Sequence, residues 1–543
     1  MTPAHESAAA AGQASYLENP PGRRGVFASW MLSTDHKRIG VMYLMALLSF
    51  FWVGVSLGLA MRLNMLHPGA LMQAQTYDEL FTVHGIVQLF LVIIPGVPVA
   101  FGNFFLPIMI GARDVAFPRL NRLSWWVYLT GAGIVVLSLF ISGHPPDTGW
   151  TFYAPYSIRT PTNVSLAVAG VFVLGFSSIL TGLNFVTTIH TMRGPGMTWL
   201  RLPLFVWTLY ATGWVQMLAT PVLAITLLFI IMGRVLGIGF FDPSRGGDPI
   251  MYEHLFWTYS HPAVYIMILP AMGIISEVIP TFARKAIFGY KAVVFASLAI
   301  AGVGYWVWGH HMFTSGMSNT ARVAFSLLTF FVAIPSGVKV FNWVATLYKG
   351  SIRLDAPMWW AVSFIFLFSI GGLSGLIQGA LAPNLDLHGT YWIVAHIHYI
   401  VFGGVGTALF AGLHYWFPKM FGRMYRERPA KLGWLIFFIG FNLLYFPMFV
   451  MGAEGMPRRW FDYSAQYHTG QMISVAGSWV LALGLLIIFG NLILALFRGE
   501  AAPENPWGGT TLEWHTPSPP PARNFPGEIP VIKHVSYKAG GNG

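Results

Sequence analysis

Six histidines are the residues of this sequence best suited to binding metal ions. Imidazole binds copper and iron, and it is a common axial ligand of haem. The six are His84, His261, the adjacent His310 and His311, and His396 and His398, which are two residues apart. We therefore treat them as candidate metal ligands and ask which of them could share an ion.

His396 and His398 cannot bind the same ion. Two residues turn a helix by about 200°, so these side chains point to opposite sides of one helix. They could instead bind two haems that flank the helix.

The remaining spacings predict a copper site with three histidine ligands. His310 and His311 are adjacent, so they can approach one ion only with help from another helix, and His261 is the natural third ligand. Tyr265 follows His261 by four residues, which puts its phenol on the same helix face, beside the expected copper. A copper with an open position next to a five-coordinate haem is the arrangement needed to split an O–O bond.

Apolar segments must position these side chains. A bilayer is crossed by a helix of about twenty apolar residues, and the mean hydropathy of the chain is +0.60. The predicted fold class is an all-α integral membrane protein with twelve transmembrane helices that enclose two haems and one copper. The predicted spans are 40–61, 80–106, 124–143, 163–191, 206–236, 254–281, 290–314, 322–347, 357–380, 391–417, 432–454 and 472–497.

The distribution of basic residues predicts the orientation of these helices. The loops on one side hold most of the Lys and Arg residues, whereas the other side holds mainly Arg62, Arg159, Arg245, Arg458 and Arg459. The positive-inside rule then places both termini in the cytoplasm. This explains the net charge of +11 without a nucleic-acid partner.

Orientation brings the six histidines to one layer. With alternating helix directions they lie at a common depth, about 10 Å below the outer surface at about 1.5 Å per residue. A histidine within a membrane is costly and usually functional. The alternative is that each is a structural histidine bonded to a neighbouring helix, but a common depth favours metal binding.

Composition excludes several classes of protein. Only 9% of the residues are charged, compared with about 25% in soluble domains. The chain has no cysteine, which excludes disulfides, thiolate-bound zinc, iron–sulfur clusters and covalently attached c-type haem on this chain.

The two ends differ from the apolar region between them. Residues 1–29 form an Ala/Gly/Ser-rich extension without the pattern of a signal peptide. Residues 499–543 form a Pro-rich tail. We expect both ends to be flexible, and residues 30–498 to form the twelve-helix core.

From about Trp30 to Trp514 the chain resembles subunit I of the haem–copper oxidases, specifically the A-type cytochrome c oxidases. The matching stretches are WMLSTDHKRIG (30–40), FTVHG (81–85), FGNFFLPIMIGARDVAFPRLN (101–121), HPAVY (261–265), WGHHMF (308–313), AIPSGVKVFNW (333–343), VAHIHY (394–399), MPRRW (456–460) and NPWGGTTLEW (505–514). The resemblance implies four-electron reduction of oxygen to water in a respiratory chain, with proton uptake and pumping across a bacterial-type cytoplasmic membrane.

The resemblance also implies roles for the metal ligands. His84 and His398 are the axial ligands of a low-spin haem, and His396 is the proximal ligand of a high-spin haem, both haems being of type A. Copper is bound by His261, His310 and His311, and Tyr265 is covalently joined to His261. Haem propionates are held by Arg458 and Arg459, and Arg62 lies beside the low-spin haem. The alternative for the arginine pair is simple anchoring at the membrane interface.

Two proton paths are implied as well. Lys339, Ser336 and Ser276 match the family's lysine path, although Lys339 could instead be a lysine that reaches the membrane surface. Asp114 matches the entrance of the second path. The polar lining of that path matches Asn103, Asn121, Asn184, Ser177 and Ser178.

Two positions depart from the family pattern. Ala263 stands where most A-type members have glutamate, and Tyr259 and Ser260 precede the copper histidine, as in a subgroup with the sequence YSHP. We expect Tyr259 and Ser260 to replace the glutamate as a proton relay, although Tyr259 could simply pack beside a haem. His388 matches a magnesium ligand, but Gly389 replaces the neighbouring aspartate, which puts magnesium in doubt.

The electron donor is expected to be cytochrome c. Quinol-oxidising relatives carry an Arg/Asp pair and a His/Gln pair where this chain has Val53, Leu57, Thr76 and Glu79. The expected partners are membrane lipid, a subunit II with a dicopper centre and a possible fused cytochrome c, and a subunit III.

Alternative functions remain open on sequence alone. A quinol oxidase and a nitric oxide reductase are the alternatives within the superfamily, and Tyr265, Lys339 and Asp114 disfavour the reductase. A secondary transporter without redox chemistry and a purely structural scaffold are the alternatives from other classes. Neither of them requires histidines in one layer.

Overall fold

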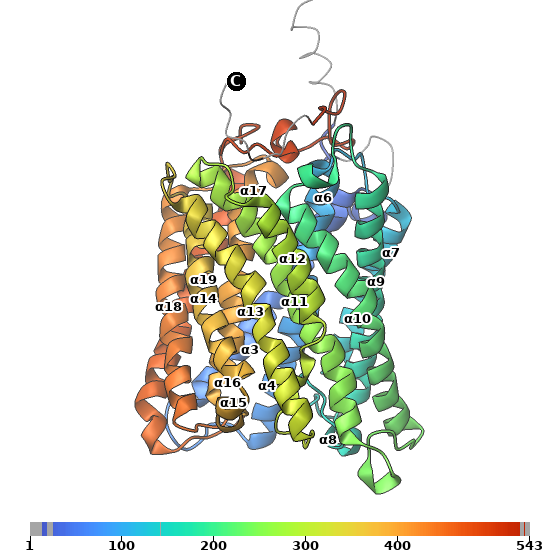
Figure 1. The fold of residues 1–543 in the computed structure, drawn as a ribbon, viewed down its shortest axis with the longest axis vertical. Helices are drawn as coiled ribbons and strands as arrows, with labels where there is room; N and C mark the ends of the chain where they lie inside the picture. The colour runs from blue at the N-terminus through green and yellow to red at the C-terminus, as the bar shows by residue number, and fades with distance from the viewer. Residues whose placement is uncertain (1–13, 19–24, 142, 533–536, 538–543) are drawn as a thin grey trace, which may run out of the picture.

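The computed structural model describes residues 14–18, 25–141, 143–532 and 537, so most of the predicted N-terminal extension lies outside the described residues. The described chain is an upright bundle of long helices (Figure 1). Ten continuous helical segments in it are long and apolar enough to cross a membrane. They are α3 (His36–Asn64), Ala74–Met109, α9 (Val164–Thr191), α10 (Leu204–Val235), α11 (Pro249–Ala283), α13 (Asn319–Leu347), α14 (Ala356–Gly379), Tyr391–Phe421, α18 (Glu427–Ala453) and Ala465–Arg498, which contains α19 (His468–Arg498).

The other two predicted spans are also helical. They correspond to α7 (Pro118–Leu137) and to the shorter α12 (Tyr290–Gly304). The predicted all-α fold is therefore confirmed, with a helix at the place of each of the twelve predicted spans.

The prediction that His310 and His311 end a continuous helix over 290–314 is wrong. α12 ends at Gly304, and the two histidines lie on a separate 3-10 helix, η5 (Trp308–Met312). At Gly304 the backbone passes so close to Tyr265 that a Cβ atom would lie 2.2 Å from the Cε2 atom of its ring. Glycine allows this close approach, and the irregular turn after it carries both histidines towards α11.

Two of the long segments are irregular where they pass the histidines. Ala74–Met109 consists of α4 (Ala74–Ile86), η1 (Val87–Ile93), α5 (Ile94–Val97), η2 (Pro98–Gly102) and α6 (Asn103–Met109), and both η1 and η2 are π-helical. Tyr391–Phe421 likewise consists of α16 (Tyr391–Ile400), the π-helical η6 (Val401–Gly406) and α17 (Thr407–Phe421). Such π segments often mark functional sites.

The expectation of a flexible C-terminal tail is wrong for residues 499–532. This segment crosses one end of the bundle, where α6 and α17 end (Figure 1), and Trp514, Thr516 and Asn524 are buried. Buried cations of the helices hold it: Lys37 Nζ donates to Asn524 Oδ1 at 2.7 Å, and Lys419 Nζ donates to the Thr516 carbonyl. We call this end of the bundle the tail side and the opposite end the far side.

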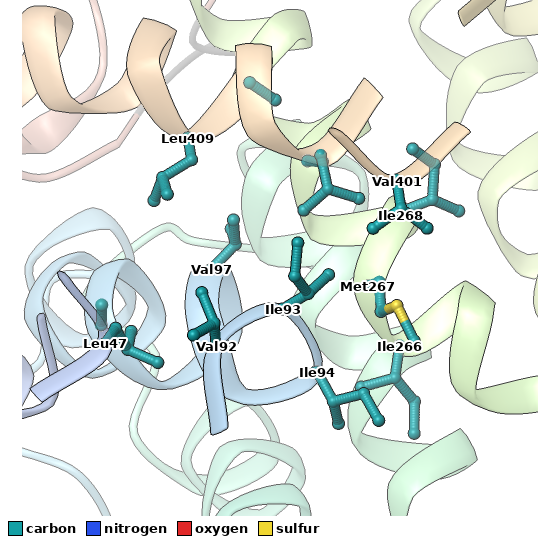
Figure 2. Close-up of a cluster of buried hydrophobic side chains, with 14 of the residues drawn as sticks. Leu47, Val92, Ile93, Ile94, Val97, Ile266, Met267, Ile268, Val401 and Leu409 are labelled. Atoms are coloured by element: carbon teal, nitrogen blue, oxygen red, sulfur yellow. The ribbon is translucent and has the colours of Figure 1, made fainter. Parts of the chain in front are cut away.

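A cluster of buried apolar side chains lies inside the bundle, and some of its members line a large cavity. Its side chains come from α3, η1, α5, α11, η6 and α17 (Figure 2), and those labelled are Leu47, Val92, Ile93, Ile94, Val97, Ile266, Met267, Ile268, Val401 and Leu409. Along α11, Ile266 lies five residues, or about 7 Å, beyond His261 towards the tail side. This part of the cluster therefore lies on the tail side of His261, and protons that pass it need polar groups.

Candidate metal and haem site

All six predicted histidines line one cavity of about 970 Å³. Its walls come from α3, α4, α11, η5, α13, α14, α16 and the loop that carries Arg458 and Arg459. Ligand sites usually measure about 300–1,000 Å³, so this cavity is large enough for bulky planar groups.

Three histidines meet at one point of the cavity wall. His261 Nδ1 lies 3.1 Å from His311 Nε2, and His310 Nε2 lies 3.0 Å from the same atom. Their ligand atoms all lie within 4.8 Å of one another. Metal–imidazole bonds are about 2 Å long, so an ion placed between these nitrogens would reach all three. The donor set fits copper, which imidazole ligands suit.

Neighbouring side chains fix each of the three rings. Tyr265 Oη lies 2.7 Å from His261 Nε2. The Thr329 hydroxyl lies 2.9 Å from His310 Nδ1, and Trp257 stacks on His311 with 3.8 Å between ring centroids. Neither Thr329 nor Trp257 is among the residues predicted from the sequence. Trp257 precedes His261 by four residues, a spacing that could have identified it, whereas nothing in the sequence indicates the pairing of Thr329 with His310.

His84 and His398 face one another across the cavity. Their rings are nearly parallel, with 6.4 Å between centroids and 25° between planes. The Nδ1 atom of His84 is hydrogen-bonded to the Gly54 carbonyl at 2.8 Å, and that of His398 to the Val394 carbonyl at 2.7 Å. These bonds leave Nε2 of each ring as the ligand atom, so the pair fits the two axial positions of one haem iron.

His396 points to different partners from His398, as the helix geometry predicts. Its Nδ1 atom lies 3.0 Å from Ser374 Oγ and 3.1 Å from the Gly371 carbonyl. A Cβ atom at Gly375 would lie 3.1 Å from His396 Cε1, so a glycine leaves room for this ring. Nε2 is again the available atom, which suits a single axial bond.

The far-side rim of the cavity is strongly basic. Burial lowers the pKa of both Arg458 and Arg459, and for Arg459 the neighbouring Arg458 adds to the effect. A guanidinium nevertheless stays charged at neutral pH, so the two cations call for anionic partners such as carboxylates. Arg62 lines the same cavity, with Cζ 5.8 Å from the Tyr391 ring centroid. His388 also lines it, and burial, followed by the effect of Arg458, lowers the pKa of His388 to about 4.

Lys339 is fully buried on α13 between the cavity and the tail side. Its Nζ donates to Ser297 Oγ at 2.9 Å and lies 5.8 Å from the Trp343 ring centroid. Ser276 Oγ accepts from Trp343 Nε1 at 3.0 Å, and Ser336 lines the cavity. Ser297, which is not among the residues predicted from the sequence, is therefore the direct partner of Lys339.

Asp114 and the residues predicted to line its path are called the Asp114 file. Asp114 lies in the loop after α6, where burial raises its pKa to about 7. Among the described atoms, several buried polar groups of this file have no hydrogen-bond partner, namely Asn103 Oδ1, both amide atoms of Asn121, Ser178 Oγ and Ser260 Oγ. Such groups usually bind ordered water. Asn184 accepts from the Phe117 backbone N–H at 3.0 Å, and Ser177 lies 3.2 Å from Tyr43 Oη.

Tyr259 lies where this file meets the histidine cavity. It lines the large cavity together with Ser260 and Ala263, and it also lines a small cavity of about 30 Å³ beside Ser177 and Ser178. Its side chain therefore bridges the two spaces.

Fold and site together define a membrane-embedded protein that gathers histidines from several helices around a cavity of haem size. The family model described as "Cytochrome C and Quinol oxidase polypeptide I" matches residues 38–480, and the chain belongs to this family of oxygen-reducing catalytic subunits. Haems and copper are the cofactors that membership implies. The alternatives of a transporter and of a structural scaffold are therefore wrong.

Similar proteins agree with this family. Cytochrome c oxidase subunit 1 of Thermostichus vulcanus is 43% identical over 510 residues, which is 94% of this chain and 92% of that protein. Cytochrome c oxidase subunit 1 of Cereibacter sphaeroides is 40% identical, with 93% and 95% covered. A solved haem–copper terminal oxidase dimer has the same fold at a TM-score of 0.74, with 20% identity and coverage of 87% of this chain and 86% of that one.

Proposed function

We propose that this chain reduces oxygen to water in a four-electron reaction at one copper and one high-spin haem, with electrons from cytochrome c. The observation that carries the proposal is the meeting of three imidazole nitrogens from α11 and η5, within 4.8 Å of one another, in the wall of a haem-sized cavity. The copper ligands are His261, His310 and His311, and the adjacent haem is bound by His396. When bound, the metals supply the electrons that cleave the O–O bond.

The second haem is low-spin and is bound by His84 and His398. Both haems are of type A, and their propionates bind to Arg458 and Arg459, with Arg62 beside the low-spin haem. Two guanidinium groups on the cavity rim offer bidentate hydrogen bonds to such carboxylates. Support for a haem with a long apolar tail comes from the apolar part of the cavity between α13 and α14, where Val340, Phe341 and Leu373 line it.

Tyr265 serves the reaction as a proton donor. Its hydroxyl lies 2.7 Å from His261 Nε2, so it can donate a proton beside the copper ligands. The covalent link between Tyr265 and His261 that the resemblance implies belongs to this proposal.

Protons reach the site by two paths and are also pumped. One path runs past Ser276, Lys339 and Ser336. The other begins at Asp114, follows Asn103, Asn121, Asn184, Ser177 and Ser178, and ends at a relay formed by Tyr259 and Ser260. The relay is supported by the position of Tyr259 between the two cavities.

The proposed setting is the bacterial-type cytoplasmic membrane, with both termini in the cytoplasm. Because the chain has no cysteine, the dicopper centre that receives electrons lies on subunit II, possibly with a fused cytochrome c, and a subunit III completes the enzyme. His388 is a candidate magnesium ligand, and Gly389 beside it offers no carboxylate. Oxidation of quinol is the alternative donor reaction.

Metal and pyridine-haem analysis of the purified enzyme tests this proposal. We expect one copper and two haems A per chain. His310→Ala should remove copper and oxygen reduction but leave the low-spin haem spectrum, whereas His84→Ala should remove the low-spin spectrum. His414→Gln is the matched control, because His414 is fully buried outside the cavity. Non-haem iron in place of copper would show a nitric oxide reductase instead, and loss of both haems in His310→Ala would show a folding role.

A further inference from the structure

Two buried carboxyl groups, Glu277 and Glu513, lie on the tail side and have no part in the mechanism above. Glu277 is on α11 and is 2% exposed, and Glu513 is in the tail and is fully buried. Each is close enough to the same aromatic pair to contact it. The Phe205 N–H donates to Glu277 Oε1 at 2.9 Å, the Trp416 indole lies 3.4 Å from Glu513 Oε1, and the rings of Phe205 and Trp416 lie 5.2 Å apart.

The two carboxyl groups differ in their hydrogen bonds. Glu277 Oε1 accepts from the Phe205 N–H, at the first turn of α10, and from Tyr537 Oη at 2.6 Å. Donors to a carboxylate and a helix N-terminus both favour its ionised form and oppose the effect of burial. Glu513 Oε2, in contrast, is buried and has no hydrogen-bond partner among the described residues. An unpaired buried carboxylate oxygen is costly, so a proton shared by the two groups belongs on Glu513.

The charges around the pair support a single stored proton. A charge on Glu513 disfavours a charge on Glu277. The nearby cation, Lys419, donates to the carbonyls of Glu504 and Thr516 rather than to a carboxylate. Burial raises the pKa of Glu513 to about 7, although Thr511, Trp416 and Lys419 act in the opposite direction. The other titratable groups that face the pair are Tyr290 of α12, Tyr415 of α17 and Tyr537 of the tail.

The pair lies at the tail-side end of the Lys339 path. Glu277 directly follows Ser276, whose hydroxyl accepts from Trp343 Nε1 at 3.0 Å, and Lys339 Nζ lies over the same Trp343 ring. Along α11, Glu277 is twelve residues, or about 18 Å, from Tyr265 on the way to the tail side. A proton held here would join the path at Ser276.

We propose that Glu513 is a protonated acid which, together with the ionised Glu277, forms the proton store that supplies the Lys339 path. This rests on the proposed role of Lys339. When the haem–copper site is reduced, the Glu513 proton moves to Glu277 and onward past Ser276. A proton from water on the tail side then replaces it. No bond other than O–H is broken or formed.

The test combines infrared and kinetic measurements on the complete enzyme. In the reduced-minus-oxidised infrared spectrum, we expect a protonated-carboxyl band that shifts in D₂O and is lost in Glu513→Gln. That variant should show at least about tenfold slower reduction of the haem–copper site. We expect the wild-type rate to fall as pH rises through about 7, and the rate of the variant to lack this fall. Glu513→Asp should restore both band and rate in part, and Glu277→Gln should slow reduction while the Glu513 band persists.

A control variant, Glu504→Gln, and a second variant, Lys339→Met, show whether the proton store or the Lys339 path is at fault if the test fails. Glu504→Gln removes an exposed acid of the same tail and should behave like the wild type in all three measurements. A wild-type rate and pH profile in Glu513→Gln, or a carboxyl band that persists in this variant, would overturn the proton store. The Lys339 path would still be supported if reduction is slow in Lys339→Met. A wild-type rate in Lys339→Met would overturn path and store together, with the haem and copper assignments still standing.

Discussion

Each of the three histidines around the candidate copper site is oriented by a neighbouring side chain. His310 is held by Thr329 of α13, His311 by Trp257 of α11, and His261 by Tyr265, one turn further along its own helix. A metal site needs its ligand atoms fixed before the ion arrives, and such outer partners are part of the site.

Replacement of Asp114 by asparagine should raise the stability of the protein and lower its proton pumping. Burial raises its pKa from 3.8 to about 7, so the folded chain holds an extra proton between these values and loses stability as pH rises through this window. Asp114→Asn cannot ionise, and its amide oxygen can still accept from the Val115 N–H. We expect the variant to unfold at a higher temperature than the wild type, with a larger difference at about pH 8 than at about pH 5, and to pump fewer protons. Equal gains at both pH values would contradict the role of burial.

Tyr259→Phe tests the proposed relay. Removal of the hydroxyl leaves the ring that packs between the two cavities, so the haem spectra should not change. Because an aromatic C–H cannot carry a proton, uptake should slow by about a hundredfold or more if the hydroxyl is essential. Proton uptake is followed with a pH dye during single turnover. Full pumping by Tyr259→Phe would show that the residue serves packing alone.

At the scale of elements, glycines decide how closely helices approach. α18 and α19 lie against one another along their length, and a Cβ atom at Gly440 of α18 would lie 2.3 Å from the backbone nitrogen of Leu481 on α19. Small residues of this kind allow close backbone contact in membranes, where packing drives helix association.

Gly440→Ala should therefore separate the two helices. We expect a loss of about 1–3 kcal/mol from overpacking, measured as a lower unfolding temperature in detergent, with the haem spectrum kept. Gly490→Ala is the matched control on α19, because nothing lies within 4 Å of the place that the added methyl group would occupy. That variant should be neutral or slightly stabilising, since alanine is a better helix former. Equal effects of the two substitutions would show that helix propensity, not close packing, governs the result.

The sequence predicts where the helices lie better than it predicts where they end or which side chains meet between them. Length and hydropathy are enough to locate the spans, because a membrane leaves little choice but helix. The break after Gly304 could not be predicted, since it depends on the Tyr265 ring from a distant helix. The pairing of Lys339 with Ser297, 42 residues apart, has no local signal either. The proline-rich composition of residues 499–532 is typical of linkers. The buried cations beneath this segment, together with its own buried Trp507 and Trp514, explain why it packs.

At the scale of the whole molecule, the tail connects α3, the first of the long apolar helices, to the last part of the chain. Asn524 accepts from Lys37 Nζ at 2.7 Å, lies 3.0 Å from His36 Nε2 through the same Oδ1 atom, and donates to the Ala112 carbonyl at 2.8 Å. One side chain thus connects α3, the end of α6 and the tail.

Asn524→Ala should weaken this connection. It removes one acceptor from the buried Lys37 ammonium, which keeps Asp35 and the Ala522 carbonyl, so we expect a cost of about 1–3 kcal/mol. We expect a lower unfolding temperature and faster proteolysis of the tail, with metal content unchanged in the protein that folds. Arg523→Ala, at an exposed neighbouring position, should have neither effect. Resistance of Asn524→Ala to proteolysis would show that the tail is held by its other contacts.

The connection between Lys37 and Asn524 also constrains the order of events during synthesis. The two residues are 487 positions apart, so at about 5–20 residues per second the ribosome needs roughly 25–100 s to deliver the partner of Lys37. Throughout that time the Lys37 ammonium at the start of α3 has Asp35 as a partner but lacks Asn524. A nascent chain that stops before Asn524 therefore leaves both His36 and Lys37 without the amide oxygen that connects α3 to the tail.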